Sequence, residues 1–256
     1  MPPAFYFGNE TSVNLNSELN RQSCSLSIVT ATYNAVSYLP DLIASLRKQT
    51  DQDFQWVVAD GSSEDGTLTL LHSINDINLL VLSQPDFGIY DALNRAIKAA
   101  SGDYYIVCGA DDVFEADAIA NFRDAIDRTQ ADIVAANVRY GKNICRPKNS
   151  MPWFWGHRTY IAAHTLATAF KNDLHQRFGF YSRKYPIAAD QLFVMQACQS
   201  GAKRINADFV AGEIGNEGVS SVDRVGNATE VFRVQLVLGQ SKYLQTLILL
   251  LRLLKS

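Results

Sequence analysis

The chain has 256 residues, of which 47% are hydrophobic and 19% charged, and its formal net charge is −3. This composition is ordinary for a domain with a sizeable core, and it excludes the basic surface by which proteins attract nucleic acid non-specifically. Four separated cysteines without a Cys-x-x-Cys pair argue against a disulfide framework or a zinc site. The polar N-terminus lacks the basic start and apolar stretch of a signal peptide, so we expect a reduced, cytoplasmic protein.

Strands and helices are predicted to alternate in the first half of the chain. Short apolar runs predict strands, and apolar residues at helical spacing predict helices. We expect strands at 26–30, 54–59 and 79–82, a further strand that ends on Asp111-Asp112, and helices at 39–49, 67–74 and 90–100. This alternation indicates an α/β fold with a mostly parallel sheet and crossover helices.

The second half of the chain is less regular. We expect a helix near 116–129, a strand at 132–138, an apolar loop at 151–155 and a helix at 191–199. The loop carries Trp153, Phe154 and Trp155, which either stack on a ligand or pack internally.

Polar residues follow three of the predicted strands, where open α/β sheets bind their ligands. The first strand leads into 31–34, with small side chains and an aromatic ring, and the second ends at Asp60 before a Gly/Ser-rich loop. Asp111 and Asp112 are adjacent, and two such carboxylates repel each other unless a cation or hydrogen-bond donors offset their charge. Mg²⁺ and Mn²⁺ prefer carboxylate oxygens and bridge them to phosphates. The alternative for each aspartate is an ordinary turn residue.

Two common nucleotide-binding motifs are absent from the sequence. No GxxxxGK[ST] occurs, and no GxGxxG follows a strand. P-loop nucleotidases and dinucleotide-binding enzymes are therefore disfavoured.

Four segments, in order, resemble the inverting family-two glycosyltransferases with the GT-A fold. They are 27–34, 57–67, 84–94 and the pair formed by Gly102-Asp103-Tyr104 with Ala110-Asp111-Asp112. The resemblance covers residues 25–221 and is closest in kind to bacterial surface-polysaccharide enzymes of the colanic-acid and O-antigen type. It implies a central, mostly parallel sheet flanked by helices.

The resemblance also implies a division of the chain. A Rossmann-like, nucleotide-sugar-binding half (25–115) precedes an acceptor and catalytic-base half (116–221). An N-terminal extension (1–24) and a C-terminal helical tail (222–256) flank this domain.

Residue by residue, the resemblance assigns a donor site, a metal ligand and a base. The donor site comprises Ala31, Tyr33, Asp60, Gly88, Asp91, Asn94 and Asp111. Asp112 would bind Mn²⁺ or Mg²⁺ directly. The simpler alternatives are a half-buried surface ring for Tyr33 and solvated helix positions for Asp91 and Asn94.

Asp190 matches the family's catalytic base, although many relatives have Glu-Asp where this chain has Ala189-Asp190. Its alternative role is the N-cap of the following helix. His164 and Arg224 would contact the acceptor or the diphosphate, and a core position is the alternative for His164. Residues 215–220 resemble a loop that closes over the site.

The resemblance therefore predicts a metal-dependent, inverting transferase that moves a sugar from a nucleotide-sugar donor, expected to be UDP-linked, to a glycan or lipid-linked acceptor. The processive members carry a Gln-x-x-Arg-Trp motif and membrane spans, which this sequence lacks, so a non-processive role in bacterial polysaccharide biosynthesis is expected. The alternative is a non-catalytic GT-A protein that binds a nucleotide sugar or acts as a scaffold. A sugar nucleotidyltransferase would need a basic, Gly-rich loop after the first strand, and 31–34 is not one.

Residues 242–255 predict a tail helix with a broad apolar face and a narrow polar stripe of Lys242, Gln245 and Arg252. Such a helix lies in a membrane interface, packs on the domain, or contacts a second copy of the chain. Membrane or partner contact is favoured, because lipid-linked acceptors are common in the resembling family. A membrane contact would place the protein peripherally on the inner face of the membrane.

Overall fold

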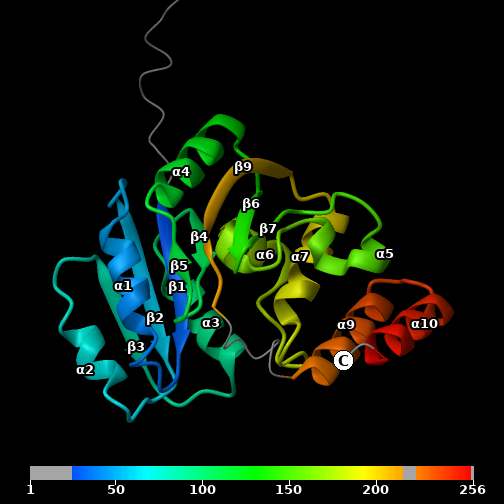
Figure 1. The fold of residues 1–256 in the computed structure, drawn as a ribbon, viewed down its shortest axis with the longest axis horizontal. Coiled ribbons are helices and arrows are strands. Elements are labelled where there is room, and N and C mark those ends of the chain that lie inside the picture. Colours follow the sequence, from blue (N-terminus) through cyan, green and yellow to red (C-terminus); the bar gives the residue numbers. More distant parts are fainter. Residues whose placement is uncertain (1–24, 216–222, 255–256) are drawn as a thin grey trace, which may run out of the picture.

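The computed structural model describes residues 25–215 and 223–254. Its first half alternates strands and helices as the sequence predicts (Figure 1). The elements are β1 (Leu26–Thr32), α1 (Leu39–Arg47), β2 (Phe54–Asp60), α2 (Thr67–His72), β3 (Leu79–Ser83), α3 (Ile89–Ala99) and β4 (Tyr104–Val107). Strands β3, β2, β1 and β4 lie side by side in that order, and all three pairings are parallel.

The second half extends the same sheet with mostly antiparallel pairings. It contains β5 (Val113–Phe114), α4 (Ala118–Thr129), β6 (Ile133–Tyr140), β7 (Asn143–Cys145), α5 (Pro152–Trp155), the 3₁₀ segments η2 (Gly156–Thr159) and η3 (Thr165–Ala167), β8 (Thr168–Lys171), α6 (Leu174–Phe178), α7 (Ala189–Gln199), β9 (Arg204–Glu213), α9 (Arg224–Val237) and α10 (Lys242–Leu253). The sheet order is β3-β2-β1-β4-β8-β6-β9-β5, with β7 on β6. Strand β9 is parallel to β6, whereas β8 is antiparallel to both β4 and β6. The α/β prediction is confirmed. The strand expected to end on Asp111-Asp112 ends at Val107, the strands β5, β7, β8 and β9 went unpredicted, and 151–155 contains a short helix.

Helices cover both faces of this sheet because its central strands are apolar on both sides. In β1, Ile28 belongs to a core with α1, α2 and α4, and the next residue, Val29, belongs to a second core with α3, α6 and α7. Successive side chains of a strand point to opposite faces, so a continuous apolar run is what a sheet buried on both sides requires.

The parallel pairing brings the predicted strand ends together at one edge. Thr32 at the end of β1 is in register with Asp60 at the end of β2. Cys108, just beyond β4, donates its backbone N–H to the carbonyl of Val29. The polar segments that follow β1, β2 and β4 therefore leave the sheet beside one another, as parallel strands require.

Candidate active site

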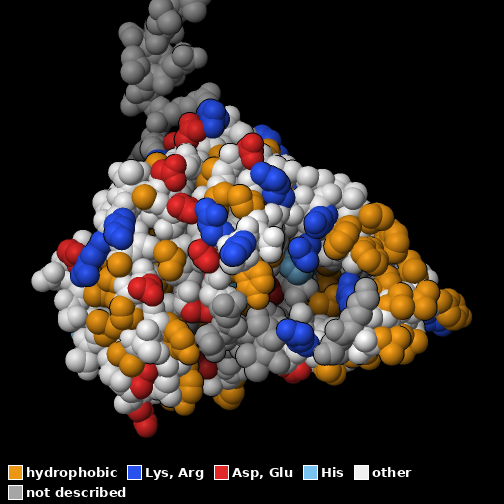
Figure 2. All heavy atoms as spheres, viewed as in Figure 1, with side chains coloured by type: hydrophobic (Ala, Val, Ile, Leu, Met, Phe, Trp, Pro, Cys, Tyr) orange, Lys and Arg blue, Asp and Glu red, His pale blue; other side chains and the backbone are white. Residues whose placement is uncertain are grey.

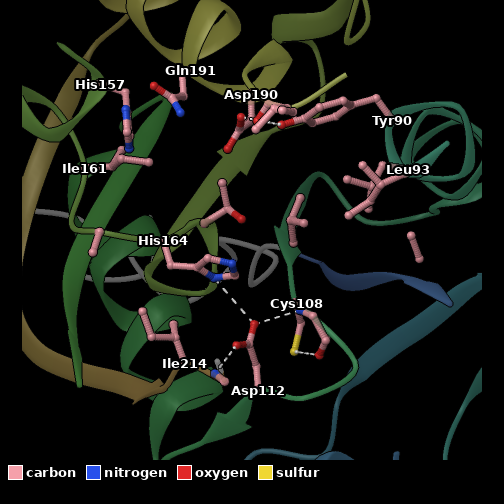
Figure 3. Close-up of a pocket in the computed structure, with 18 of the residues that line it drawn as sticks. Tyr90, Leu93, Cys108, Asp112, His157, Ile161, His164, Asp190, Gln191 and Ile214 are labelled. Carbon is pink, nitrogen blue, oxygen red and sulfur yellow. Dashed lines mark hydrogen bonds and ion pairs between the residues drawn. The ribbon is translucent and has the colours of Figure 1, made fainter. Parts of the chain in front are cut away.

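A cavity of about 440 Å³ lies beyond the ends of β1 and β4 and is closed by α3, η2 and the start of α7. It brings together five of the residues singled out in the sequence. They are Ala31, Asp111, Asp112, His164 and Asp190. Figure 3 shows Asp112 and His164 on one side of the cavity and Asp190 on the other.

Asp112 is held in place by the backbone. Its side chain is 1% exposed, and its Oδ2 and Oδ1 accept N–H groups of Gly109 at 2.7 Å and of Gly215 at 3.0 Å. Gly215 also lies against Asp111, because a Cβ at Gly215 would come within 1.9 Å of Asp111 Oδ2. A side chain at this position, two residues beyond the end of β9, would displace Asp111, so the chain packs directly against the carboxylate pair here.

The surroundings of Asp112 suit a hard cation. His164 Nδ1 accepts the N–H of Leu166 at 3.3 Å and also lies 3.5 Å from Asp112 Oδ2. A nitrogen that accepts a hydrogen bond has no proton to give, so it repels the carboxylate unless a proton or a cation lies between them. Asp111 and Asp112 line the cavity and supply carboxylate oxygens, the ligands that Mn²⁺ and Mg²⁺ prefer.

The protein groups alone are too few to enclose such an ion. Among residues 25–215 and 223–254, no cluster of three or more His, Cys, Asp or Glu side chains is assembled to hold a metal. Mg²⁺ characteristically binds through one or two carboxylates and completes its shell with water and substrate phosphates. The residues present fit a metal of that kind.

Asp190 lies in the first turn of α7, where its Oδ1 accepts the phenol O–H of Tyr90 at 2.6 Å. The same phenol lies 2.9 Å from the carbonyl of Ile187. Burial, together with the charge of Asp190, raises the pKa of Tyr90 well above its usual value, so the phenol keeps its proton. Tyr90 therefore donates to Asp190 throughout the physiological pH range.

The alternative that Asp190 caps α7 is wrong. Ala188 occupies the N-cap position, and its side chain makes no capping hydrogen bond. Glu230, from α9, accepts the backbone N–H groups of Ile187 and Ala188, each at 2.9 Å. A carboxylate more than 40 positions along the chain thus supports the start of α7 and leaves Asp190 facing the cavity.

The structure adds two polar residues beside Asp190 that sequence reasoning missed, His157 and Gln191 (Figure 3). Burial lowers the pKa of His157, although the charge of Asp190 and a hydrogen bond with Gln191 oppose the shift, so its imidazole is neutral near pH 7. Gln191 follows Asp190 directly in the first turn of the predicted helix, and this position next to the proposed base could have identified it. His157 had no motif to identify it.

Asp60 lies beneath the cavity and not on its surface, and its expected contact with a base stays a prediction. Its side chain is completely buried, and its two oxygens accept four hydrogen bonds, from the hydroxyls of Thr32, Ser63 and Ser83 and from the N–H of Ser63. Burial alone would raise the pKa of Asp60, but these hydrogen bonds outweigh it and lower the pKa. Asp60 ties the ends of β1, β2 and β3 together.

Tyr33 is 69% exposed, so the half-buried alternative is wrong. It does not line the cavity but borders the loop after β2, where a Cβ on Gly61 would meet Tyr33 at 3.3 Å and Asp86 Oδ2 at 2.7 Å. Gly88 also lies outside the cavity lining, at the N-cap of α3 with a φ of 108° that favours glycine.

Asp91 and Asn94, on α3, are anchors in this structure and do not line the cavity. Asn94 exchanges two hydrogen bonds with the backbone of Tyr181, at 2.8 and 3.0 Å. Asp91 pairs with Arg183 and accepts the N–H of Phe87 at 3.3 Å. These contacts hold 181–183 against α3 and exclude the solvated alternative, and the expected contact of Asp91 and Asn94 with the donor stays a prediction.

The remaining predicted residues lie at the edge of what the structure describes. Arg224 is the exposed first residue of α9 and is not among the residues that line the cavity, so the arrangement lends its predicted role no support. Of the predicted closing loop, 215–220, only Gly215 falls within the described residues.

Comparison with known proteins identifies the family of the chain. The family model described as "Glycosyl transferase family 2" matches residues 27–194. A protein of Mycobacterium tuberculosis (strain ATCC 25177 / H37Ra) named "PGL/p-HBAD biosynthesis glycosyltransferase" is 30% identical over 177 residues, 64% of this chain and 66% of that relative. "Glycosyltransferase GlyG" of Streptococcus pneumoniae is 28% identical over 115 residues, 44% of this chain and 38% of its own length. The chain thus spans just under two thirds of the mycobacterial relative.

Solved structures share the fold at low sequence identity. TarS 1–349 of S. aureus in complex with UDP-GlcNAc superposes with a TM-score of 0.67 at 20% identity, over 88% of this chain and 70% of that one. The mannosyltransferase PcManGT from Pyrobaculum calidifontis, in complex with GDP-Man and Mn²⁺, gives 0.68 at 19% identity, over 90% and 69%. At this identity the likeness shows the fold.

Proposed function

Since the chain belongs to glycosyltransferase family 2, we propose that it is a metal-dependent, inverting glycosyltransferase, which moves one sugar from a nucleotide-sugar donor to a glycan or lipid-linked acceptor in bacterial polysaccharide biosynthesis. One observation carries the proposal: Asp112 and Asp190 face a single cavity from opposite sides. Inverting transfer needs stabilisation of the leaving diphosphate on one side and a base for the attacking hydroxyl on the other.

The leaving-group side is built around Asp112, which would hold the metal, with Asp111 and His164 beside it in the cavity lining. A bound Mn²⁺ or Mg²⁺ would supply a Lewis acid that stabilises the negative charge on the diphosphate. The backbone N–H groups of Gly109 and Gly215 fix Asp112, so its carboxylate needs no rearrangement to meet a ligand. The donors in the two similar structures, UDP-GlcNAc and GDP-Man, support a nucleotide sugar as the substrate.

The acceptor side is built around Asp190. Tyr90 occupies Oδ1, and Oδ2 has no hydrogen-bond partner among the described residues, so Oδ2 is the oxygen that receives the proton. The acceptor hydroxyl passes its proton to Oδ2 as its oxygen bonds to the anomeric carbon. The bond from that carbon to the diphosphate breaks on the opposite face, and the diphosphate leaves with the electron pair. This single displacement inverts the anomeric centre.

The nucleotide would lie toward the loops after β1 and β2. Asp60 and Asp111 would then have different roles. Tyr33 offers an exposed ring on which a base can stack. Asp60 shapes this region from below through Thr32 and Ser63, and Asp111 remains on the cavity wall toward the donor. The likeness to UDP- and GDP-sugar complexes leaves both bases as candidates.

A donor panel tests the proposal. The purified chain is incubated with UDP- and GDP-linked sugars, with Mn²⁺ or with a chelator, and both nucleotide binding and slow donor hydrolysis are measured. We expect at least one donor to bind and be hydrolysed only with the metal. We expect Asp112→Asn to abolish both at a temperature well below its own melting point, which should fall because the amide nitrogen cannot accept a backbone N–H. Metal-independent binding without hydrolysis of any donor would favour the non-catalytic alternative.

A further inference from the structure

An exposed apolar surface lies at the end of the molecule formed by α5, α9 and α10. Figure 2 shows hydrophobic side chains gathered there, with lysines and arginines beside them. We call it the α5–α10 surface and define it by its exposed apolar side chains, Met151, Trp153, Phe154, Tyr243, Leu244, Leu247, Leu250, Leu251 and Leu254. Contiguous apolar patches of this kind mark binding sites for proteins or membranes.

The packing of α10 leaves this surface free. The helix contacts α9 and α5 through its opposite side, where Gln245 and Ile248 are buried. Gln245 donates to the carbonyl of Trp153 at 2.7 Å, and Arg252 donates to the carbonyl of Phe154 at 2.8 Å. The tail helix therefore packs on the domain and still presents a second, apolar face to its surroundings.

Basic residues outnumber acidic ones in the segments that form and adjoin the α5–α10 surface, although the exposed Asp223 caps the start of α9. The segment 142–158 contains Lys142, Arg146, Lys148 and Arg158 and no Asp or Glu. In 224–254 the only acidic residue is Glu230, which is buried under α7. Among the ion pairs of residues 25–215 and 223–254, none involves these four cations or Arg233, Lys242 and Arg252. In a chain of net charge −3, this is a local concentration of unpaired positive charge.

Aromatic rings connect the basic and apolar parts. The Lys148 ammonium lies 5.1 Å from the centre of the Trp155 ring, and the Lys242 ammonium 5.1 Å from that of Tyr243. Rings with an apolar body and a polar edge favour the boundary between lipid headgroups and hydrocarbon, and basic residues beside them favour anionic headgroups.

We infer that the α5–α10 surface binds the headgroup region of an anionic lipid bilayer, with α10 lying in the plane of the interface. A helix of 12 residues is about 18 Å long, which is less than the ~30 Å of a bilayer core. None of the helices that the structure describes is long and apolar enough to cross a membrane. A symmetric contact between two copies is disfavoured, because it would bring two positively charged rims together.

This placement also brings the cavity close to the bilayer. Arg158 in η2 lines the cavity and lies 6.0 Å from the Trp155 ring, so one short segment belongs both to the cavity wall and to the border of the surface. The idea that a lipid-linked acceptor enters the cavity from this side rests on the proposed function. Binding of the bilayer does not depend on that function, and it is measured without donor or acceptor.

Co-sedimentation of the full chain with vesicles tests the inference. We expect binding to vesicles that contain phosphatidylglycerol, little binding to phosphatidylcholine alone, and weaker binding at high salt. Replacing Leu247, Leu250 and Leu251 together by Gln should reduce binding at least ten-fold. Lys148→Glu and Lys242→Glu should each reduce it about five-fold or more, because a basic residue near an anionic surface contributes about 1 kcal/mol. Leu80→Gln, an exposed leucine on β3, is the matched control and should bind like the parent.

Two results would overturn the inference. One is undiminished vesicle binding by the triple variant and by both charge variants. The other is a parent chain that does not bind anionic vesicles but forms a dimer, while the triple variant is a monomer. That result would show that the surface binds a second copy of the chain. The triple variant could melt at a lower temperature than the parent and lose binding for that reason. Lys148→Glu and Lys242→Glu change only exposed side chains, so their binding tests the inference independently of folding.

Discussion

Two carboxylates face the same cavity from different surroundings, and this difference separates their roles. Asp112 is almost fully buried and accepts two backbone N–H groups, whereas Asp190 accepts one phenol and keeps its second oxygen available among the described residues. A ligand for a cation must hold a fixed position, and a base needs one oxygen that can gain a proton. The fixed carboxylate of Asp112 therefore suits cation binding, and the partly free carboxylate of Asp190 suits proton transfer.

Replacing Asp190 by Asn should separate catalysis from binding. We expect donor affinity to stay within about two-fold, and transfer to fall by about 10²–10⁴-fold, because the amide cannot accept the proton. Donor binding by calorimetry and product formation are the measurements. Asp41→Asn, which removes an acid from the first turn of α1, controls for the loss of charge at a helix start. Transfer near the parental rate would leave the base unassigned.

Tyr90 should act as a positioning residue for Asp190. Tyr90→Phe removes one donor and keeps the ring, so we expect kcat to fall about ten-fold, the scale of a hydrogen bond to a charged group, while KM for the donor is unchanged. Tyr104→Phe is the control, because its buried hydroxyl donates to the carbonyl of Ala131, and neither residue lines the cavity. An equal loss in both variants would indicate a general packing effect.

At the scale of elements, Asp60 joins three strands through hydrogen bonds to Thr32, Ser63 and Ser83. Its pKa is lower in the folded chain than in the unfolded one, where it is about 3.9. The contribution of Asp60 to stability is therefore complete above that unfolded value and is lost as the pH falls through the lower, folded pKa.

We expect Asp60→Asn to lower the free energy of unfolding by about 1–3 kcal/mol at pH 7, because the amide nitrogen cannot accept these hydrogen bonds. The difference between variant and parent should shrink in acid, once the parental carboxyl is protonated. Urea unfolding at pH 7 and below pH 4 measures both. Asp53→Asn, with a side chain 95% exposed, should change stability little. If the stability difference between Asp60→Asn and the parent were the same at all pH values, the ionised carboxylate of Asp60 would not be the source of the stabilisation.

At the scale of the whole molecule, the helical tail is both part of the domain and an outward-facing surface. Ile248 is 5% exposed and Leu250 is 55% exposed, although they lie two positions apart on α10. We expect Ile248→Ala to cost about 2–4 kcal/mol of stability and Leu250→Ala less than about 0.5 kcal/mol. Thermal and urea unfolding of the two variants measures the difference. Equal, small effects would mean that α10 does not pack on the domain as described.

Local sequence pattern was sufficient to predict the strands and helices in the first half of the chain. Strands β1 to β4 are short apolar runs, their helices carry apolar residues at helical spacing, and the parallel order places their polar ends at one edge. The resemblance to the family also singled out Asp112 and Asp190, which the fold brings to one cavity. These features depend on residues near one another in the chain, so a single sequence reveals them.

Tertiary contacts decided the features that depend on partners far along the chain. Glu230 supports the start of α7 and frees Asp190 from capping, Tyr181 occupies Asn94, and Ser83 helps to enclose Asp60. The sequence predicted an apolar tail helix, but only its packing shows which side is buried. Burial and hydrogen-bond partners are set by the folded arrangement of distant segments, and these determine whether a polar side chain meets a ligand or holds the protein together.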